Sequence, residues 1–238
     1  PPPSPPPSTC HPLGGGSGSC LSVDQMAGAT TSYEFGGDGV VYITTTHRAN
    51  VWTNRNDAIV LYAKPLPPAP WVAHAQMRLV RSHGIKNLMG MMAYQGPDGS
   101  MVPFHFGPQT WGSSESWRNR SVFQTTSAGT GMRASGGGTT LSDINHLIDP
   151  FSWRWYRLAM AADGEIFASL SRDEGGSWST PPAWDDASWE AQVSITLTSG
   201  SWPDRLGFVH KTDDTGENVC AIRGFTLAMH QPPSPPLP

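Results

Sequence analysis

Apolar and polar side chains alternate with a period of two over one long segment, residues 71–80, and this alternation is typical of a β-strand with one buried face. On one face lie five apolar residues: Trp71, Ala73, Ala75, Met77 and Leu79. The intervening positions include three polar residues, His74, Gln76 and Arg78. The segment therefore predicts a strand with a core face and a solvent-facing polar face.

Short segments rich in β-branched and aromatic residues follow one another along most of the chain, separated by Gly, Pro and Asp turn signals. They predict strands at 40–46, 58–63, 88–95, 101–106, 121–126, 153–162, 166–172, 193–198, 205–211 and 219–229. Helical periodicity is almost absent, with one short turn of helix expected at 187–192 or 142–148. The dipeptide Asp163-Gly164 predicts a two-residue hairpin turn. We therefore expect an all-β fold, a two-sheet antiparallel jelly-roll sandwich over residues 21–230.

Proline-rich segments flank this domain at 1–20 and 231–238, beginning with PPPSPPPS and ending with QPPSPPLP. Proline fixes φ and lacks an N–H, so such segments favour extended polyproline II and act as stiff spacers. Disordered linkers are the alternative. We expect at least one tail to become ordered in an assembly, packed on another copy or glycosylated at Pro or Ser.

The composition narrows the class of partner. The formal net charge is −4, which leaves no general basic field for a nucleic-acid backbone. No apolar run is long enough for a membrane span, and no membrane insertion is expected. Ten tryptophans supply both core volume and flat surfaces on which sugar rings can stack. An extracellular location, as a secreted, cell-surface or virion-surface protein, fits these features.

Three cysteines are an odd number. Cys10 and Cys20 bracket a flexible HPLGGGSGS stretch that a disulfide could close. Cys220 lies in an apolar run typical of a free, buried thiol, although pairing of Cys220 with Cys10 or Cys20 remains the alternative. No CxxC or HxxxH spacing accompanies them, so neither a metal site nor a cofactor is expected.

The segment 171–178, SRDEGGSW, matches the Asp-box turn S-x-D-x-G-x-S-W. In this turn the Asp and Ser side chains bind turn amides, Gly takes a positive φ and Trp packs beneath the hairpin. We interpret Ser171, Asp173, Gly175 and Trp178 as a structural turn. A sialidase would need several such boxes and an arginine triad.

From residue 88 to residue 227 the order of motifs resembles concanavalin A-like modules of phage virion proteins and of secreted glycan-binding proteins. The shared features are PFHFG at 103–107, WYRL at 155–158, a D-G turn, the S-x-D-x-G hairpin and DRLGFV at 204–209. The Ser-Pro-Pro tails are similar to hydroxyproline-rich glycoproteins of algal and plant walls. The resemblance implies a lectin-type sandwich, and it leaves an algal or protist source and a phage source both open.

Sugar-cleaving relatives of that fold carry acidic residues at alternate positions of one strand, which places two carboxyl groups on one face. This chain has no such strand, and its carboxylates cluster in turns. It also lacks the G-x-S-x-G of serine hydrolases and a phosphate-binding loop. We therefore expect no enzymatic activity.

A sugar site needs an aromatic platform surrounded by planar polar groups. The polar face of 71–80 supplies three candidates, and aromatic residues elsewhere in the chain supply three more. The predicted carbohydrate-binding residues are His74, Gln76, Arg78, Tyr94, Trp111 and Trp117. The alternative is that these aromatic residues cap the core or pack against a neighbouring subunit.

Three functions follow from these observations. The first is a structural, glycan-contacting building block of an extracellular or virion fibre, in which copies of the chain bind one another. The second is a lectin or receptor-binding domain, for example of a phage tail fibre. The third, a glycoside hydrolase or lyase, is disfavoured by the missing carboxylate pair.

Overall fold

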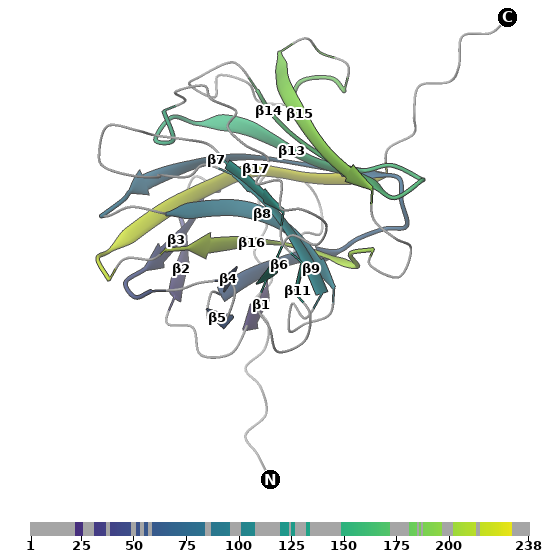
Figure 1. Cartoon of the computed structure of the whole chain (residues 1–238). Helices are drawn as coiled ribbons and strands as arrows, with labels where there is room; N and C mark the ends of the chain where they lie inside the picture. Colours follow the sequence, from purple (N-terminus) through teal and green to yellow (C-terminus); the bar gives the residue numbers. More distant parts are fainter. Residues whose placement is uncertain are drawn as a thin grey trace, which may run out of the picture.

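A computed structural model describes residues 22–25, 31–36, 39–48, 51–52, 55–56, 59–83, 87–95, 101–107, 120–123, 125–126, 132–133, 149–171, 181–184, 186, 188–196, 202–212 and 215–229. All regular elements of this described part are β-strands (Figure 1). The cysteines Cys10 and Cys20, the two tails and the possible helical turn at 142–148 lie outside it.

Two antiparallel sheets form the sandwich. The first, six-stranded, has the order β1 (Ser22–Gln25), β6 (Ile59–Pro65), β16 (Arg205–Lys211), β8 (Leu88–Gln95), β9 (Met101–Gly107) and β10 (Arg120–Phe123). The second, seven-stranded, has the order β15 (Trp189–Thr196), β14 (Glu165–Ser171), β13 (Arg154–Met160), β7 (Trp71–Arg81), β17 (Asn218–Met229), β3 (Val41–Thr45) and β2 (Thr31–Phe35). The predicted all-β, two-sheet antiparallel sandwich is confirmed.

Two small ribbons accompany the sheets, β4 (Val51–Trp52) with β5 (Arg55–Asn56) and β11 (Thr125–Thr126) with β12 (Met132–Arg133). The polar segments of β1 and β2 were not predicted from the sequence, because neither is rich in β-branched residues. Both lie at sheet edges, where pairing with a single neighbour is enough to extend the backbone.

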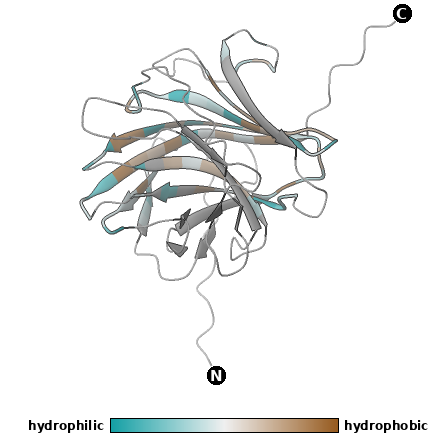
Figure 2. Ribbon diagram, viewed as in Figure 1, coloured by the Kyte–Doolittle hydropathy of each residue, from teal (hydrophilic) through white to brown (hydrophobic). Residues whose placement is uncertain are grey.

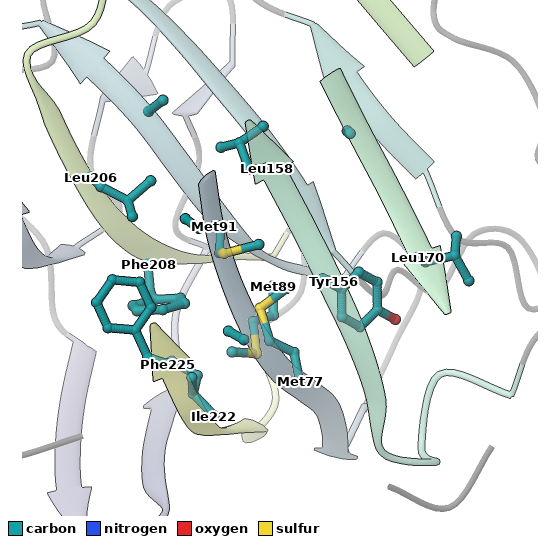
Figure 3. Packing of buried hydrophobic residues seen from close by; sticks show 14 of the residues in the cluster. Met77, Met89, Met91, Tyr156, Leu158, Leu170, Leu206, Phe208, Ile222 and Phe225 are labelled. Carbon is teal, nitrogen blue, oxygen red and sulfur yellow. The ribbon is translucent and has the colours of Figure 1, made fainter. Parts of the chain in front are cut away.

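The hydrophobic core lies between the two sheets. The five apolar residues of the 71–80 pattern all belong to it, which confirms the predicted core face of β7. The same cluster contains Met89, Met91 and Phe208 of the opposite sheet, which Figure 3 labels together with Met77 of β7. Phe208 of β16 contacts Phe225 of β17 edge to face at 5.3 Å, which joins the sheets directly. In Figure 2 hydrophobic segments accordingly run along the middle of β7, β8 and β17.

The hairpin between β13 and β14 is confirmed, but its turn is longer than the predicted two residues. Gly164 N–H donates to the Ala161 carbonyl at 3.1 Å, and Ala161 N–H donates to the Glu165 carbonyl at 2.8 Å. Gly164 has φ +90°, which completes a type I turn followed by a glycine bulge. Asp163 uses its carboxylate to accept from Glu165 N–H at 3.1 Å, so the loop closes on three residues.

The expected helical turn at 187–192 is wrong, because β15 begins at Trp189 and pairs with β14 from Ser171 onward. Three of the four residues in the local sequence WEAQ are good helix formers. Pairing with an existing strand satisfies backbone groups along the whole segment, and this tertiary contact overrides local propensity.

Cys220 is a free, fully buried thiol, as expected, and its Sγ donates to the Ile43 carbonyl at 3.6 Å. Burial raises the pKa of this thiol well above its usual range. The thiolate form is therefore disfavoured, and we expect Cys220 to be a poor nucleophile.

Gly224 sits at a bulge of β17 with φ +62°, and a Cβ placed there would lie 2.9 Å from Cη2 of Trp155. We expect Gly224→Ala to lower the free energy of unfolding by about 2 kcal/mol, from left-handed backbone strain and overlap with this buried ring. Gly39→Ala is the matched control, because Gly39 has φ +78° but open space around it. It should cost about 1 kcal/mol. Urea denaturation measures both, and equal losses would show that the Trp155 contact is irrelevant.

Candidate functional site

The outer face of the seven-stranded sheet, turned away from the core, carries the predicted polar residues of β7. The strand register places a residue of β13 on one side of His74 and Gln76, and a residue of β17 on the other. His74 lies between Arg157 of β13 and Thr226 of β17, and Gln76 lies between Trp155 and Arg223. Residues far apart in the sequence therefore form one continuous surface.

The alternation predicted that this face is exposed to solvent, but most of its side chains are buried or half-buried. Gln76 is 2 % exposed, Trp155 2 % and Arg157 1 %, whereas His74 and Arg78 are half-buried. Other side chains cover the sheet here and form a second packed layer outside the main core.

Arg157 is the centre of one part of this layer. Its Nε donates to Ser169 Oγ at 2.7 Å, and its Nη1 donates to the Trp184 carbonyl at 2.7 Å. The guanidinium also lies 4.4 Å from the ring centroids of both Trp184 and Trp189. Burial lowers the pKa of Arg157 to about 10, so the group stays protonated at neutral pH.

Trp184, which precedes β15, and Trp189, the first residue of β15, supply the aromatic cover over Arg157. Trp189 Nε1 donates to the Ala183 carbonyl at 2.8 Å, and the Trp189 ring stacks on His74 with centroids 5.7 Å apart. Trp184 meets Phe167 edge to face at 6.4 Å. Each ring is thus fixed by at least two contacts.

A second part of the layer surrounds Trp153, the half-buried residue before β13. The guanidinium groups of Arg223 and Arg78 lie 4.3 Å and 4.8 Å from its ring centroid. Arg223 Nε also donates to Gln76 Oε1 at 2.6 Å. We call the whole surface the tryptophan–arginine face, which consists of Arg78, Trp153, Trp155, Arg157, Trp184, Trp189 and Arg223.

Of the six residues predicted for sugar binding, three lie together here: His74, Gln76 and Arg78. Tyr94 does not join them, since it belongs to β8 of the other sheet and is fully buried. Its neighbour Ala93 is a core residue, so alternation along β8 turns Tyr94 away from the core, towards the outside of the six-stranded sheet. Trp111 and Trp117 lie outside the described residues.

The predicted structural turn is described only at Ser171, because Asp173, Gly175 and Trp178 lie outside the described part. Ser171 is buried at the end of β14, and its Oγ accepts from Trp155 N–H at 3.2 Å. This hydroxyl therefore helps to hold Trp155 in place on the sheet.

Sequence reasoning missed most of the tryptophan–arginine face. Trp153, Trp155 and Arg157 alternate in the segment WRWYR, and this spacing alone would have placed them on one side of a strand. Trp184, Trp189 and Arg223 gave no local signal, because only the pairing of distant strands brings them to the same surface.

The tryptophan–arginine face combines two kinds of side chain. Aromatic rings and cationic guanidinium groups dominate it, and the described residues contain no group of three or more His, Cys, Asp or Glu side chains placed to hold a metal ion. Within the same residues, no helix has the length and apolar character needed to cross a membrane.

Comparisons with known proteins point to the fold. No family model matches the chain, and no curated protein matches it. Among solved structures, a functionally unknown protein from Saccharomyces cerevisiae has a TM-score of 0.54 at 12 % identity, over 89 % of this chain and 97 % of that chain.

Two further similarities are weaker. An engineered GH43 glycoside hydrolase with endo-xylanase and exo-arabinofuranosidase activity has a TM-score of 0.48 at 14 % identity, over 88 % of this chain and 41 % of that one. A CBM2 module of the evolved Dit protein of Lactobacillus casei BL23 phage J-1 has a TM-score of 0.44 at 12 % identity, over 86 % and 90 %. At 12 % identity, the similarity to the yeast protein supports the two-sheet sandwich fold alone.

Proposed function

We propose that this chain is a non-catalytic, glycan-binding β-sandwich of the concanavalin A-like type that acts outside the cell, and that the tryptophan–arginine face binds the sugar. The observation that carries the proposal is Trp153, a half-buried ring held by the guanidinium groups of Arg78 and Arg223.

Sugar rings present C–H groups that pack on aromatic rings, and hydroxyls that need planar polar partners nearby. The tryptophan–arginine face offers both kinds of group in one place. The rings of Trp153, Trp184 and Trp189 are each fixed by neighbouring arginines. A platform that is already ordered loses little conformational entropy when a ligand binds, which favours affinity.

The polar groups on this face suit binding better than hydrolysis. Glycoside hydrolysis ordinarily needs two carboxyl groups, about 5 to 9.5 Å apart, on either side of the scissile bond. Among the described outward-facing positions of β7, β13, β14 and β17, Glu165 beside the hairpin turn supplies the sole carboxylate. We therefore expect no release of reducing ends, and no unsaturated ends from uronic-acid polymers, on prolonged incubation with polysaccharides.

The setting we propose is an extracellular fibre on a cell or a virion. Serine-proline segments at both ends would hold the sandwich away from its neighbours as extended spacers, and would carry covalently attached sugars or pack on another copy. In that arrangement the fibre repeats the domain, and each copy presents a tryptophan–arginine face to glycans.

Trp153→Ala tests the proposal. We expect the variant to remain folded, because Trp153 is partly exposed, and to bind a recognised glycan at least about tenfold more weakly, since an aromatic stacking platform is lost. Screening on a glycan array followed by titration calorimetry gives the measurement.

Tyr33→Ala is the matched control, an exposed aromatic residue (39 %) on β2 at the far edge of the same sheet. Its affinity should equal that of the wild type. Unchanged binding by Trp153→Ala, or equal losses in the two variants, would count against the tryptophan–arginine face as the binding surface.

A further inference from the structure

The positive charge of the tryptophan–arginine face is unusual for a chain with a net charge of −4. Arg78, Arg157 and Arg223 converge there. Neither Arg78 nor Arg157 has an ion pair with a carboxylate of the described residues. By contrast, Arg81, at the end of the same strand β7, pairs with Glu217.

Structural roles explain Arg157 but not Arg78. The Arg157 guanidinium is buried and donates to both Ser169 and the Trp184 carbonyl, which accounts for its position. Arg78 is half-buried and lies against the Trp153 ring, while its Nε is buried without a hydrogen-bond partner among the described residues. One donor of Arg78 therefore has no hydrogen-bond partner in the described part of the chain, next to the half-buried Trp153 ring.

Gln76 adds a second unused donor at the same place. It is 2 % exposed, its Oε1 accepts from Arg223, and its Nε2 is buried without a hydrogen-bond partner in the described part of the chain. Buried donors left unpaired are costly, and native proteins rarely retain them without a ligand, a water molecule or a function. Gln76 and Arg78 are two residues apart on one strand, so both side chains project from the same face.

We propose that the ligand of this face is an anionic glycan, one whose sugar units carry carboxylate or sulfate groups. The sugar ring packs on Trp153, and its anionic group accepts hydrogen bonds from the half-buried Arg78. Arg223 lies beside it and is held by the buried Gln76 through Oε1. This inference rests on the proposed function and adds the chemical class of the ligand.

Charge and geometry favour this ligand over the alternatives. Guanidinium groups bind carboxylate and sulfate oxygens with paired hydrogen bonds, and these charge-assisted bonds are about twice as strong as neutral ones. A neutral sugar would leave the positive charge of Arg78 uncompensated. A nucleic acid would be attracted mainly by a broad basic surface, whereas this chain is acidic overall.

The experiment compares pairs of polysaccharides that share a backbone and differ in whether the sugar units carry an anionic group. One pair is polygalacturonate and its fully methyl-esterified form, and the other is a sulfated galactan and its desulfated form. Titration calorimetry or affinity electrophoresis at moderate salt gives the dissociation constants for wild type, Arg78→Gln and Arg48→Gln. Arg48 is an exposed arginine in the turn after β3 and serves as the matched control.

We expect at least one anionic member to bind about tenfold or more tightly than its neutral partner, because charged hydrogen bonds contribute that much. Arg78→Gln should remove this preference, and Arg48→Gln should leave it intact. Preference within the pectin pair assigns a carboxylate and preference within the galactan pair assigns a sulfate; either result supports the proposal.

Thermal unfolding of every variant shows whether weaker binding results from a folding defect. Arg78→Lys and Arg223→Gln are added as two further substitutions on the same face. Lysine keeps the charge but loses the planar fork, so Arg78→Lys should retain part of the preference. If neutral and anionic members bind equally while Trp153→Ala abolishes binding, the proposed function stands and the anionic ligand is wrong. Absence of binding to every glycan overturns both, and single-stranded DNA binding as tightly as the anionic glycan overturns the specificity proposed here.

Discussion

Arg157→Ala should lower the free energy of unfolding by about 3 kcal/mol, one of the largest effects expected of a single change outside the main core. The variant loses the hydrogen bonds to Ser169 Oγ and the Trp184 carbonyl. It also loses the guanidinium that lies 4.4 Å from the rings of Trp184 and Trp189, and it leaves a cavity beneath them. The two buried hydrogen bonds contribute about 2 kcal/mol together. The cation–π contacts add about 1 kcal/mol net, because removal of the guanidinium also removes the cost of burying its charge.

Chemical denaturation of three variants measures this effect. Arg157→Lys should recover less than half of the loss, because lysine cannot donate to both acceptors in the plane of the fork. Arg48→Ala, at an exposed arginine, should change stability by less than about 0.5 kcal/mol. A loss below about 1 kcal/mol for Arg157→Ala would show that the outer layer folds independently of this residue.

The loss of Arg157 should also weaken glycan binding, although Arg157 is too buried to reach a ligand by itself. Its role is to position Trp184 and Trp189, so the variant should bind more weakly because these rings become mobile. This interpretation predicts a larger entropic cost of binding in calorimetry, whereas loss of a direct contact would appear mainly as lost enthalpy.

The fold was predictable because the alternation and composition of short segments indicate most of its strands. Alternation along residues 71–80 separated core from outer positions correctly, and the short β-rich segments marked most strands of both sheets. Errors occurred where the local pattern was weak. The strand β15 begins with residues that favour a helix, and the edge strands β1 and β2 are polar, so pairing with neighbouring strands defines them more than composition does.

The candidate site was only partly predictable because it depends on which strands are neighbours. Within one strand the sequence showed that His74, Gln76 and Arg78 share a face. It could not show that β13 and β17 flank β7 and bring Arg157 and Arg223 beside them. Tyr94 was misplaced for the same reason, since β8 follows β7 along the chain but crosses to the opposite sheet.

Lowering the pH should reduce the free energy of unfolding through a second buried polar residue, His210. It lies on β16 opposite Met89, is fully buried, and shares a 3.2 Å hydrogen bond between its Nδ1 and Thr45 Oγ1 of the other sheet. Burial lowers the pKa of His210 from 6.5 to about 4, and a backbone hydrogen bond at Ile43 opposes this only in part. The folded protein therefore holds a neutral imidazole that joins the two sheets.

The sign of the pH effect follows from this lowered pKa. The unfolded chain takes up a proton near pH 6.5, but folded His210 resists it until about pH 4. The neutral form thus contributes its full stability above pH 6.5, and this contribution is lost progressively between about pH 6.5 and 4. The total loss is about 3 kcal/mol, since one pKa unit corresponds to about 1.4 kcal/mol.

Urea denaturation at several pH values between 7 and 4 measures the loss in wild type and in two variants. His210→Gln keeps a hydrogen-bonding group near Thr45 but cannot titrate, so its stability should be lower at pH 7 and should fall much less than that of the wild type across this range. His47→Gln, at an exposed histidine in the turn after β3, should follow the wild-type slope. If the free energy of unfolding of His210→Gln falls with pH as steeply as that of the wild type, other groups take up the proton on acid unfolding. In that case the neutral His210 between the sheets does not determine how stability depends on pH.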